Sequence, residues 1–187
     1  MKLRQLMYVS MFAAVVAALG IFPPIPVPFT PVPITAQTLG VMLAGAVLGA
    51  RLGFMSMGLF VLLVAVGLPV LAGGRGGLGI LFGTSGGYIL SWPFAALVIG
   101  YLVQTNWSKI RLWKMVCFNI IGGVLVVYAG GITYLSIVTD LTWFQAAGSA
   151  LIYIPGDMVK AVVAGSVAIS IRKALFPRAI EPLKRAS

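Results

Sequence analysis

Tyr153-Ile-Pro-Gly-Asp-Met-Val-Lys160 opens an apolar segment that continues to about Leu175. About 20 apolar residues are needed for a helix to cross a bilayer, and this segment has that length. Asp157 and Lys160 are three residues apart, so they share one face of the predicted helix. Ionisable groups inside a membrane segment are costly and usually mark a functional site in a bundle interior or a wet cavity. Two simpler roles stay open, because Asp157 can cap the helix and Lys160 can extend to the membrane surface.

The composition is that of an integral membrane protein. Hydrophobic residues make up 60% of the 187 residues and charged residues 9%, whereas a soluble domain has about 45–50% apolar and about 25% charged residues. The net charge of +10 would suggest nucleic acid in a soluble protein. Here most basic residues lie between predicted spans and act as topology signals, so we expect no nucleic-acid partner.

Histidine is absent from the sequence, and Cys117 is the only cysteine. Without histidine, the usual proton shuttle and a common metal ligand are missing, so we expect neither a metal site nor catalysis. A single cysteine excludes an internal disulfide, and its apolar surroundings favour a small buried side chain.

Six membrane spans fit the apolar pattern best. The first follows Lys2 and Arg4 and resembles a secretory signal, but its apolar stretch is long and more spans follow, so we interpret it as a retained span. A piece around residues 143–154 is expected to lie at the interface or to re-enter the membrane. The predicted spans cover roughly residues 5–21, 37–50, 54–72, 87–103, 115–135 and 155–175.

The segment at residues 23–35 contains six prolines and no charge. This density of proline forbids a regular helix and favours a stiff, extended backbone. An uncharged stiff loop fits a segment that lies against the membrane face or over a cavity. A simple rigid linker fits the composition equally well.

A glycine-rich loop, Gly73-Gly-Arg-Gly-Gly-Leu-Gly79, follows the third predicted span. It lacks the Gly-Lys-Ser/Thr of a phosphate-binding loop, and its glycines instead allow tight turns or a close approach to a ligand. Arg75 is suited to a ligand carboxylate, or is an ordinary exposed arginine. The next motif, Gly83-Thr-Ser-Gly-Gly-Tyr88, has a serine but no base to activate it, so we do not expect an enzyme.

Basic residues are distributed unevenly across the predicted membrane. With the N-terminus in the cytoplasm, eleven of the thirteen lie inside, Arg75 lies outside and Lys160 lies within a span. This asymmetry supports one six-span domain over residues 1–187 with both termini inside, and it puts the proline segment, the glycine loop and Asp157 on the outer side. The inside residues are Lys2, Arg4, Arg51, Lys109, Arg111, Lys114, Arg172, Lys173, Arg178, Lys184 and Arg185.

The first predicted span carries small residues four apart, in the pairs Ala13 and Ala17 and Ala14 and Ala18. Such a face lets another helix approach closely. The partner is either a second membrane subunit or another helix of the same bundle.

Three motifs occur in order along the chain: Pro31-Val-Pro-Ile-Thr-Ala-Gln-Thr-Leu-Gly-Val-Met-Leu-Ala-Gly45, then Gly73-Gly-Arg-Gly-Gly77 with Gly83-Thr-Ser-Gly-Gly-Tyr88, then Pro155-Gly-Asp-Met-Val-Lys160. Together they resemble the BioY family, the biotin-binding membrane subunits of energy-coupling-factor (ECF) vitamin importers. The resemblance covers nearly the whole chain, with one departure at Thr84-Ser85, where the family typically has Pro-Thr.

The resemblance implies an all-α, six-helix subunit of the prokaryotic cytoplasmic membrane, whose pocket opens outward beneath an ordered first loop. It implies biotin as a transported ligand rather than a cofactor. It also implies a partner complex made of a transmembrane scaffold and two cytoplasmic ATPases. The alanine face of the first span matches the family's scaffold-docking surface.

Biotin's ureido ring has two N–H donors and one carbonyl, so Asp157 suits the N–H groups. Lys160 can donate to the carbonyl, orient Asp157 or meet the valerate carboxylate, for which Arg75 is the other candidate. Apolar and aromatic side chains would line the rest of the pocket. Further candidates for polar contacts are Gln37, Thr35, Tyr88 and Asn119.

Two other interpretations stay open. One is a related subunit for another vitamin, such as thiamine or riboflavin. The other is a membrane assembly protein that binds no ligand.

Overall fold

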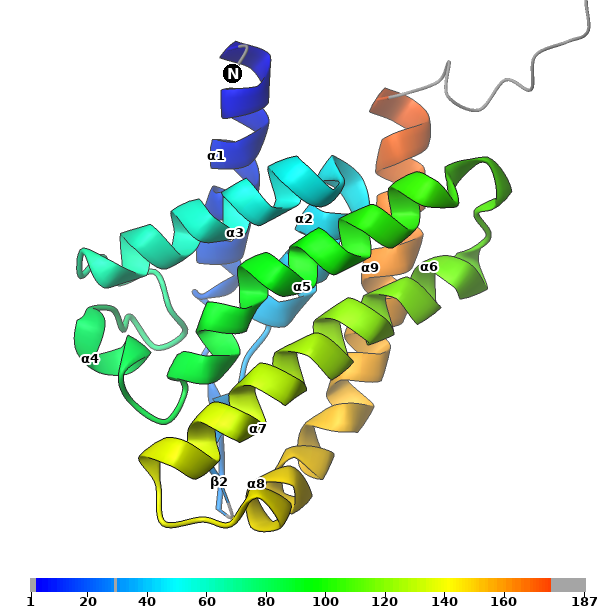
Figure 1. Ribbon diagram of the computed structural model, residues 1–187. Helices are drawn as coiled ribbons and strands as arrows, with labels where there is room; N and C mark the ends of the chain where they lie inside the picture. The colour runs from blue at the N-terminus through cyan, green and yellow to red at the C-terminus, as the bar shows by residue number, and fades with distance from the viewer. Residues whose placement is uncertain (1–2, 29, 176–187) are drawn as a thin grey trace, which may run out of the picture.

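A computed structural model of the protein describes residues 3–28 and 30–175, and most of these residues are helical (Figure 1). Helices α6, η2 and α7 follow one another without a break and form one long rod. The elements in order are α1 (Leu3–Leu19), β1 (Ile25–Val27), β2 (Thr30–Ile34), α2 (Gln37–Leu48), α3 (Ala50–Ala65), α4 (Leu78–Leu81), α5 (Gly86–Thr105), η1 (Trp107–Lys109), α6 (Leu112–Ile120), η2 (Ile121–Val126), α7 (Val127–Val138), α8 (Trp143–Ala150), η3 (Leu151–Tyr153) and α9 (Ile154–Leu175).

Each predicted span coincides with a helix or a continuous run of helices. The largest difference is at α3, which ends at Ala65 instead of near residue 72. Gly67 has a φ of 99°, a left-handed conformation that a helix cannot contain, and Pro69 follows it. The piece expected to be interfacial or re-entrant forms α8 and η3, which continue without a break into α9.

Three of these helical segments are long and apolar enough to cross a membrane: Gly86–Thr105, Leu112–Val138 and Trp143–Arg172. The other three apolar helices are shorter, at 17, 12 and 16 residues for α1, α2 and α3. At about 1.5 Å per residue, a 12-residue helix spans only about 18 Å of a hydrocarbon core of about 30 Å. The molecule is therefore a helical membrane protein in which some helices are shorter than the bilayer is thick.

The proline segment folds into a small antiparallel hairpin, in which Ile25 pairs with Ile34 and Val27 pairs with Thr30. The expectation of an extended, ordered loop is confirmed, but the all-α description needs this two-stranded addition. Proline lacks an N–H group and is tolerated on edge strands. In a two-stranded sheet both strands are edges, so the prolines fit.

Helix α5 is the central helix and packs against α2, α3 and α7. Its Gly100 permits a close approach to α3, because a side chain there would collide with the backbone of Ala50 at the start of α3. Small residues of this kind let membrane helices pack backbone to backbone.

Cys117 is exposed on α6, so the expectation of a buried cysteine is wrong. It lies two residues from each of the buried residues Met115 and Asn119. Residues two apart lie on nearly opposite sides of a helix, which turns Cys117 outward.

Different elements form the two ends of the molecule. The start of α1, the junction of α2 and α3, the turn at η1 and the end of α9 lie at one end, the top of Figure 1. The hairpin, α4 and α8 lie towards the other end. Lys2, Arg178, Lys184 and Arg185 are outside the described residues.

Candidate functional site

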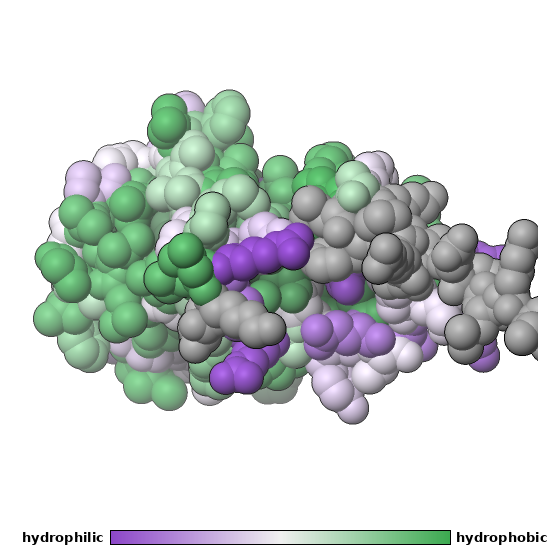
Figure 2. Space-filling model, turned by 90° about the horizontal axis from the view of Figure 1, so that it is seen from above, coloured by the Kyte–Doolittle hydropathy of each residue, from purple (hydrophilic) through white to green (hydrophobic). Residues whose placement is uncertain are grey.

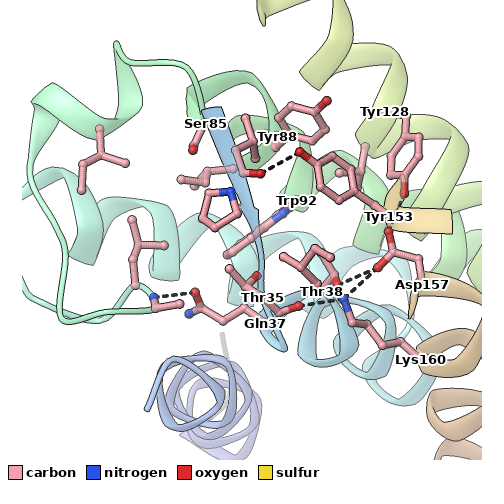
Figure 3. Close-up of a pocket in the computed structure, with 18 of the residues that line it drawn as sticks. Thr35, Gln37, Thr38, Ser85, Tyr88, Trp92, Tyr128, Tyr153, Asp157 and Lys160 are labelled. Atoms are coloured by element: carbon pink, nitrogen blue, oxygen red, sulfur yellow. Dashed lines mark hydrogen bonds and ion pairs between the residues drawn. The ribbon is translucent and has the colours of Figure 1, made fainter. Parts of the chain in front are cut away.

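A pocket lies between the hairpin, the glycine loop and helices α5, α7 and α9, with a cavity volume of about 680 Å³ that includes its open mouth. Figure 3 shows side chains from these separate parts of the chain pointing into one space. The lining combines polar and charged side chains with apolar and aromatic ones, as ligand pockets typically do.

Asp157 and Lys160 form an ion pair in the pocket wall, with Lys160 Nζ 2.9 Å from Asp157 Oδ1. Asp157 is 4% exposed and accepts further hydrogen bonds from Thr38 Oγ1 at 3.3 Å and from the Tyr128 hydroxyl at 2.7 Å. A carboxylate has about four acceptor positions. With three occupied, Asp157 retains the capacity to accept from one more donor.

Lys160 has no donor left over. Its Nζ donates to the backbone oxygen of Thr35 at 2.7 Å, to Thr38 Oγ1 at 3.0 Å and to Asp157. An ammonium group has three N–H donors, and all three are engaged. In this arrangement Lys160 orients Asp157 and anchors the start of α2.

Two buried hydrogen-bond donors in the pocket wall have no partner among the described residues: the Tyr88 hydroxyl and Trp92 Nε1. Their side chains are only 8% and 4% exposed, and Figure 3 shows both at the pocket. Buried polar groups are nearly always paired, since an unmade hydrogen bond costs about 1–3 kcal/mol. These donors are therefore suited to acceptor atoms of a ligand.

Three tyrosines form the aromatic side of the pocket. Tyr88 and Tyr153 each contact Tyr128 edge-to-face, at centroid distances of 6.4 Å. Room for the Tyr88 ring comes from Gly131, where a Cβ would overlap that ring. The Tyr153 hydroxyl donates to the backbone oxygen of Val32 at 2.7 Å and lies 2.6 Å from Thr30 Oγ1, so it ties the hairpin to the pocket.

Arg75 lies at the exposed edge of the pocket. Its Nε donates to the backbone oxygen of Ala72 at 3.1 Å, which fixes the base of the guanidinium group. Thr35 also lines the pocket. The structure thus brings Arg75, Thr35 and Tyr88 together with the ion pair.

Gln37 lines the pocket as expected but is 1% exposed, and its amide is engaged with the protein's own backbone. Asn119 is not brought to the pocket. It is fully buried, and its Nδ2 donates to the backbone oxygen of Ala161 at 3.0 Å, so it joins α6 to α9.

The alanines of α1 divide between two environments. Ala13 is 1% exposed and belongs to the hydrophobic core, so it packs inside this protein's own bundle. Ala14 and Ala18 are exposed and Ala17 is intermediate. Only the outward-facing members leave a surface that a second membrane protein can contact.

Sequence reasoning missed several pocket residues. Trp92 follows Tyr88 by four residues, so the shared helix face was a usable signal. Tyr128 gave no local signal, because an aromatic residue in an apolar span looks like ordinary core. Tyr153 lay in the piece expected at the interface, where tyrosine is a common anchor. The missed residues that line the pocket include Thr38, Ser85, Trp92, Tyr128 and Tyr153.

Comparisons with known proteins agree with one another. Residues 1–176 match the family model of the BioY family. The "Biotin transporter BioY" of Rhizobium etli is 49% identical over 88% of this chain and 90% of its own, and the "Probable biotin transporter BioY" of Bacillus subtilis is 42% identical over 94% of each. A crystal structure of "the S-component for biotin from an ECF-type ABC transporter" superposes with a TM-score of 0.87, at 34% identity over 92% of both chains. On its sequence and its fold alike, this chain belongs to the BioY family.

Proposed function

We propose that this chain is the biotin-binding membrane subunit of an ECF-type vitamin importer, which captures biotin from outside the cell. The observation that carries the proposal is the Asp157–Lys160 pair in the wall of this pocket, in a chain whose relatives are named biotin transporters. The family is one of transport proteins, so the chain is not an enzyme.

The polar groups of the pocket support one orientation of biotin. Asp157 keeps one acceptor position, which suits an N–H group of the ureido ring. All three N–H donors of Lys160 bond to groups within the protein. We therefore assign the valerate carboxylate to Arg75, at the exposed edge of the pocket. Guanidinium groups bind carboxylates in paired hydrogen bonds, and the Nη atoms of Arg75 suit this role.

The unpartnered donors lie at the wall of the same pocket. Trp92 Nε1 and the Tyr88 hydroxyl can donate to the ureido carbonyl or to the carboxylate, because both groups accept hydrogen bonds. The three tyrosines would pack against the fused rings and the aliphatic chain. Asn119 is left out of this site, since it lies outside the pocket lining.

The proposed topology has six spans in a single domain over residues 1–187, with both termini in the cytoplasm. Basic residues among the described part of the chain support it, because they gather at one end of the molecule. Figure 2 looks onto this end and shows hydrophilic side chains standing out among apolar ones. These residues are Arg4, Arg51, Lys109, Arg111, Lys114 and Arg172. The short helices α2 and α3 would cross only part of the bilayer, and the hairpin would continue α2 on the outer side.

The proposed partners are a transmembrane scaffold subunit and two cytoplasmic ATPases. The solved relative is an S-component of an ECF-type ABC transporter, and a binding subunit alone cannot accumulate its ligand. The exposed Ala14 and Ala18 are the proposed contact for the scaffold.

Mass spectrometry of the ligand released from the purified protein tests the proposed function. We expect biotin in stoichiometric amounts, and after its removal we expect competition by biotin but not by thiamine or riboflavin. Release of a different vitamin would overturn the biotin assignment. The absence of any bound or rebinding small molecule would favour an assembly protein instead.

A further inference from the structure

Gln37, at the first position of α2, joins three separate parts of the chain through its amide. Its Nε2 donates to the backbone oxygens of Val16 and Val70, both at 3.0 Å, and its Oε1 accepts from the Ala72 backbone N–H at 3.0 Å. The residue is 1% exposed. Both donors and the acceptor of this buried side chain are therefore satisfied by backbone.

The bond to Val16 is available because α1 ends there. Gly20 N–H bonds to the Ala17 oxygen, three residues back, at 2.9 Å, so the Val16 oxygen lacks its usual helical partner. Gln37 supplies that partner. The Nε2 atom of Gln37 thus joins α1 to Val70, and its Oε1 atom holds Ala72.

The held segment leads directly to Arg75. Leu71 and Arg75 form an isolated antiparallel bridge, with Leu71 N–H donating to the Arg75 oxygen at 3.0 Å. The tight turn between them uses Gly73 and Gly74, whose φ values are 80° and 66°. The Ala72 oxygen then accepts from Arg75 Nε at 3.1 Å. Ala72 is therefore bonded to Gln37 on one side and to the guanidinium group on the other.

We propose that Gln37 is a positioning residue, which sets the place of the Arg75 guanidinium at the edge of the pocket by clamping Ala72 to α1. This inference rests on the proposed function, in which Arg75 meets the ligand carboxylate. It replaces the expectation that Gln37 contacts the ligand. Both N–H donors of Gln37 are occupied by backbone oxygens, so donating to a ligand would require Gln37 to give up a buried bond, whereas a positioning role uses all of its bonds as they stand.

The test compares biotin with biotin amide, in which a neutral carboxamide replaces the carboxylate. Gln37→Met removes the hydrogen bonds at similar length and is expected to lower biotin affinity by about three- to tenfold, while affinity for the amide changes less than about twofold. Arg75→Gln should produce the same selective loss. The double variant should lose no more than either single variant, because both changes break one linked unit.

Gln104→Met is the matched control. Gln104 also accepts from a backbone N–H, that of Ala50 at 3.2 Å, but it is exposed and far from the pocket lining, so neither affinity should change. If Gln37→Met does not fold, Gln37→Asn takes its place with the same expectation. Asn is one CH₂ shorter and cannot hold α1 and Ala72 together.

Four results overturn the inference. Equal losses for both ligands would make Gln37 a direct contact or a general support of the pocket. Unchanged biotin affinity, or losses that add in the double variant, would separate Gln37 from Arg75. In these three cases biotin binding by the wild-type protein still stands, so the proposed function survives. A wild-type protein that does not bind biotin would instead overturn the proposed function and this inference together.

Discussion

Asp157 is the acceptor at which the polar contacts of the pocket converge, because Lys160, Thr38 and Tyr128 all bond to its carboxylate. Their common effect is to hold both oxygens in fixed directions while one acceptor position stays open. A fixed acceptor binds an N–H donor with little loss of side-chain freedom. In the proposed site, the pair would therefore contribute to affinity through orientation as well as charge.

Asp157→Asn keeps the size of this side chain and removes its charge. A hydrogen bond to a charged group contributes about 1.5–3 kcal/mol, so biotin affinity should fall by about 10- to 150-fold. Titration of biotin into the purified variant measures this. An unchanged affinity in a folded protein would mean that the Asp157 carboxylate only pairs with Lys160, Thr38 and Tyr128 and does not bind the ligand.

Trp92→Phe tests the unpartnered indole donor. The variant keeps an aromatic ring, which packs 5.5 Å from Phe60 between centroids, and loses only the N–H group. If a ligand acceptor uses that group, biotin affinity should fall by about two- to tenfold. Trp143→Phe, at an exposed position on α8, should have no effect. Unchanged affinity, together with a higher melting temperature of the unliganded protein, would mean that the ligand does not use Trp92.

At the scale of elements, sequence patterns located the helices because each span is one long apolar run bounded by glycine, proline or basic residues. They could not predict the hairpin pairing, since Ile25 and Ile34 meet only through the turn between them.

In the candidate site too, some residues could be predicted from the sequence and others could not. Asp157, Lys160 and Arg75 stood out as charges in apolar or uncharged surroundings, whereas Tyr128 on α7 and Tyr153 on η3 become pocket residues only when the fold brings their rings together. Asn119 was misplaced because polarity in a span does not reveal which neighbouring helix it faces.

Helix α1 offers a separate test of partner docking. Ala14→Trp adds bulk at an exposed position and should leave biotin binding intact, because Ala14 does not line the pocket. It should weaken assembly with the scaffold subunit and abolish ATP-dependent uptake. Co-purification and uptake assays measure the two effects. Leu125→Trp is the control, because Leu125 is also exposed but lies on η2. Loss of biotin binding together with assembly would place Ala14 in this protein's own packing.

At the scale of the whole molecule, the distribution of charge predicts the orientation in the membrane. In a Cys117→Ser background, which removes the exposed native thiol, a cysteine at position 75 should react with an impermeant reagent from outside. A cysteine at position 109 should react only after the membrane is permeabilised. Labelling of both positions from the same side would contradict the six-span topology.

The structure of the biotin-bound protein tests whether one pocket binds biotin in one orientation. We predict biotin between the hairpin and helices α5, α7 and α9, with its ureido ring against Asp157 and its carboxylate at Arg75. Biotin bound elsewhere, or turned so that its carboxylate meets Lys160, would contradict this binding mode.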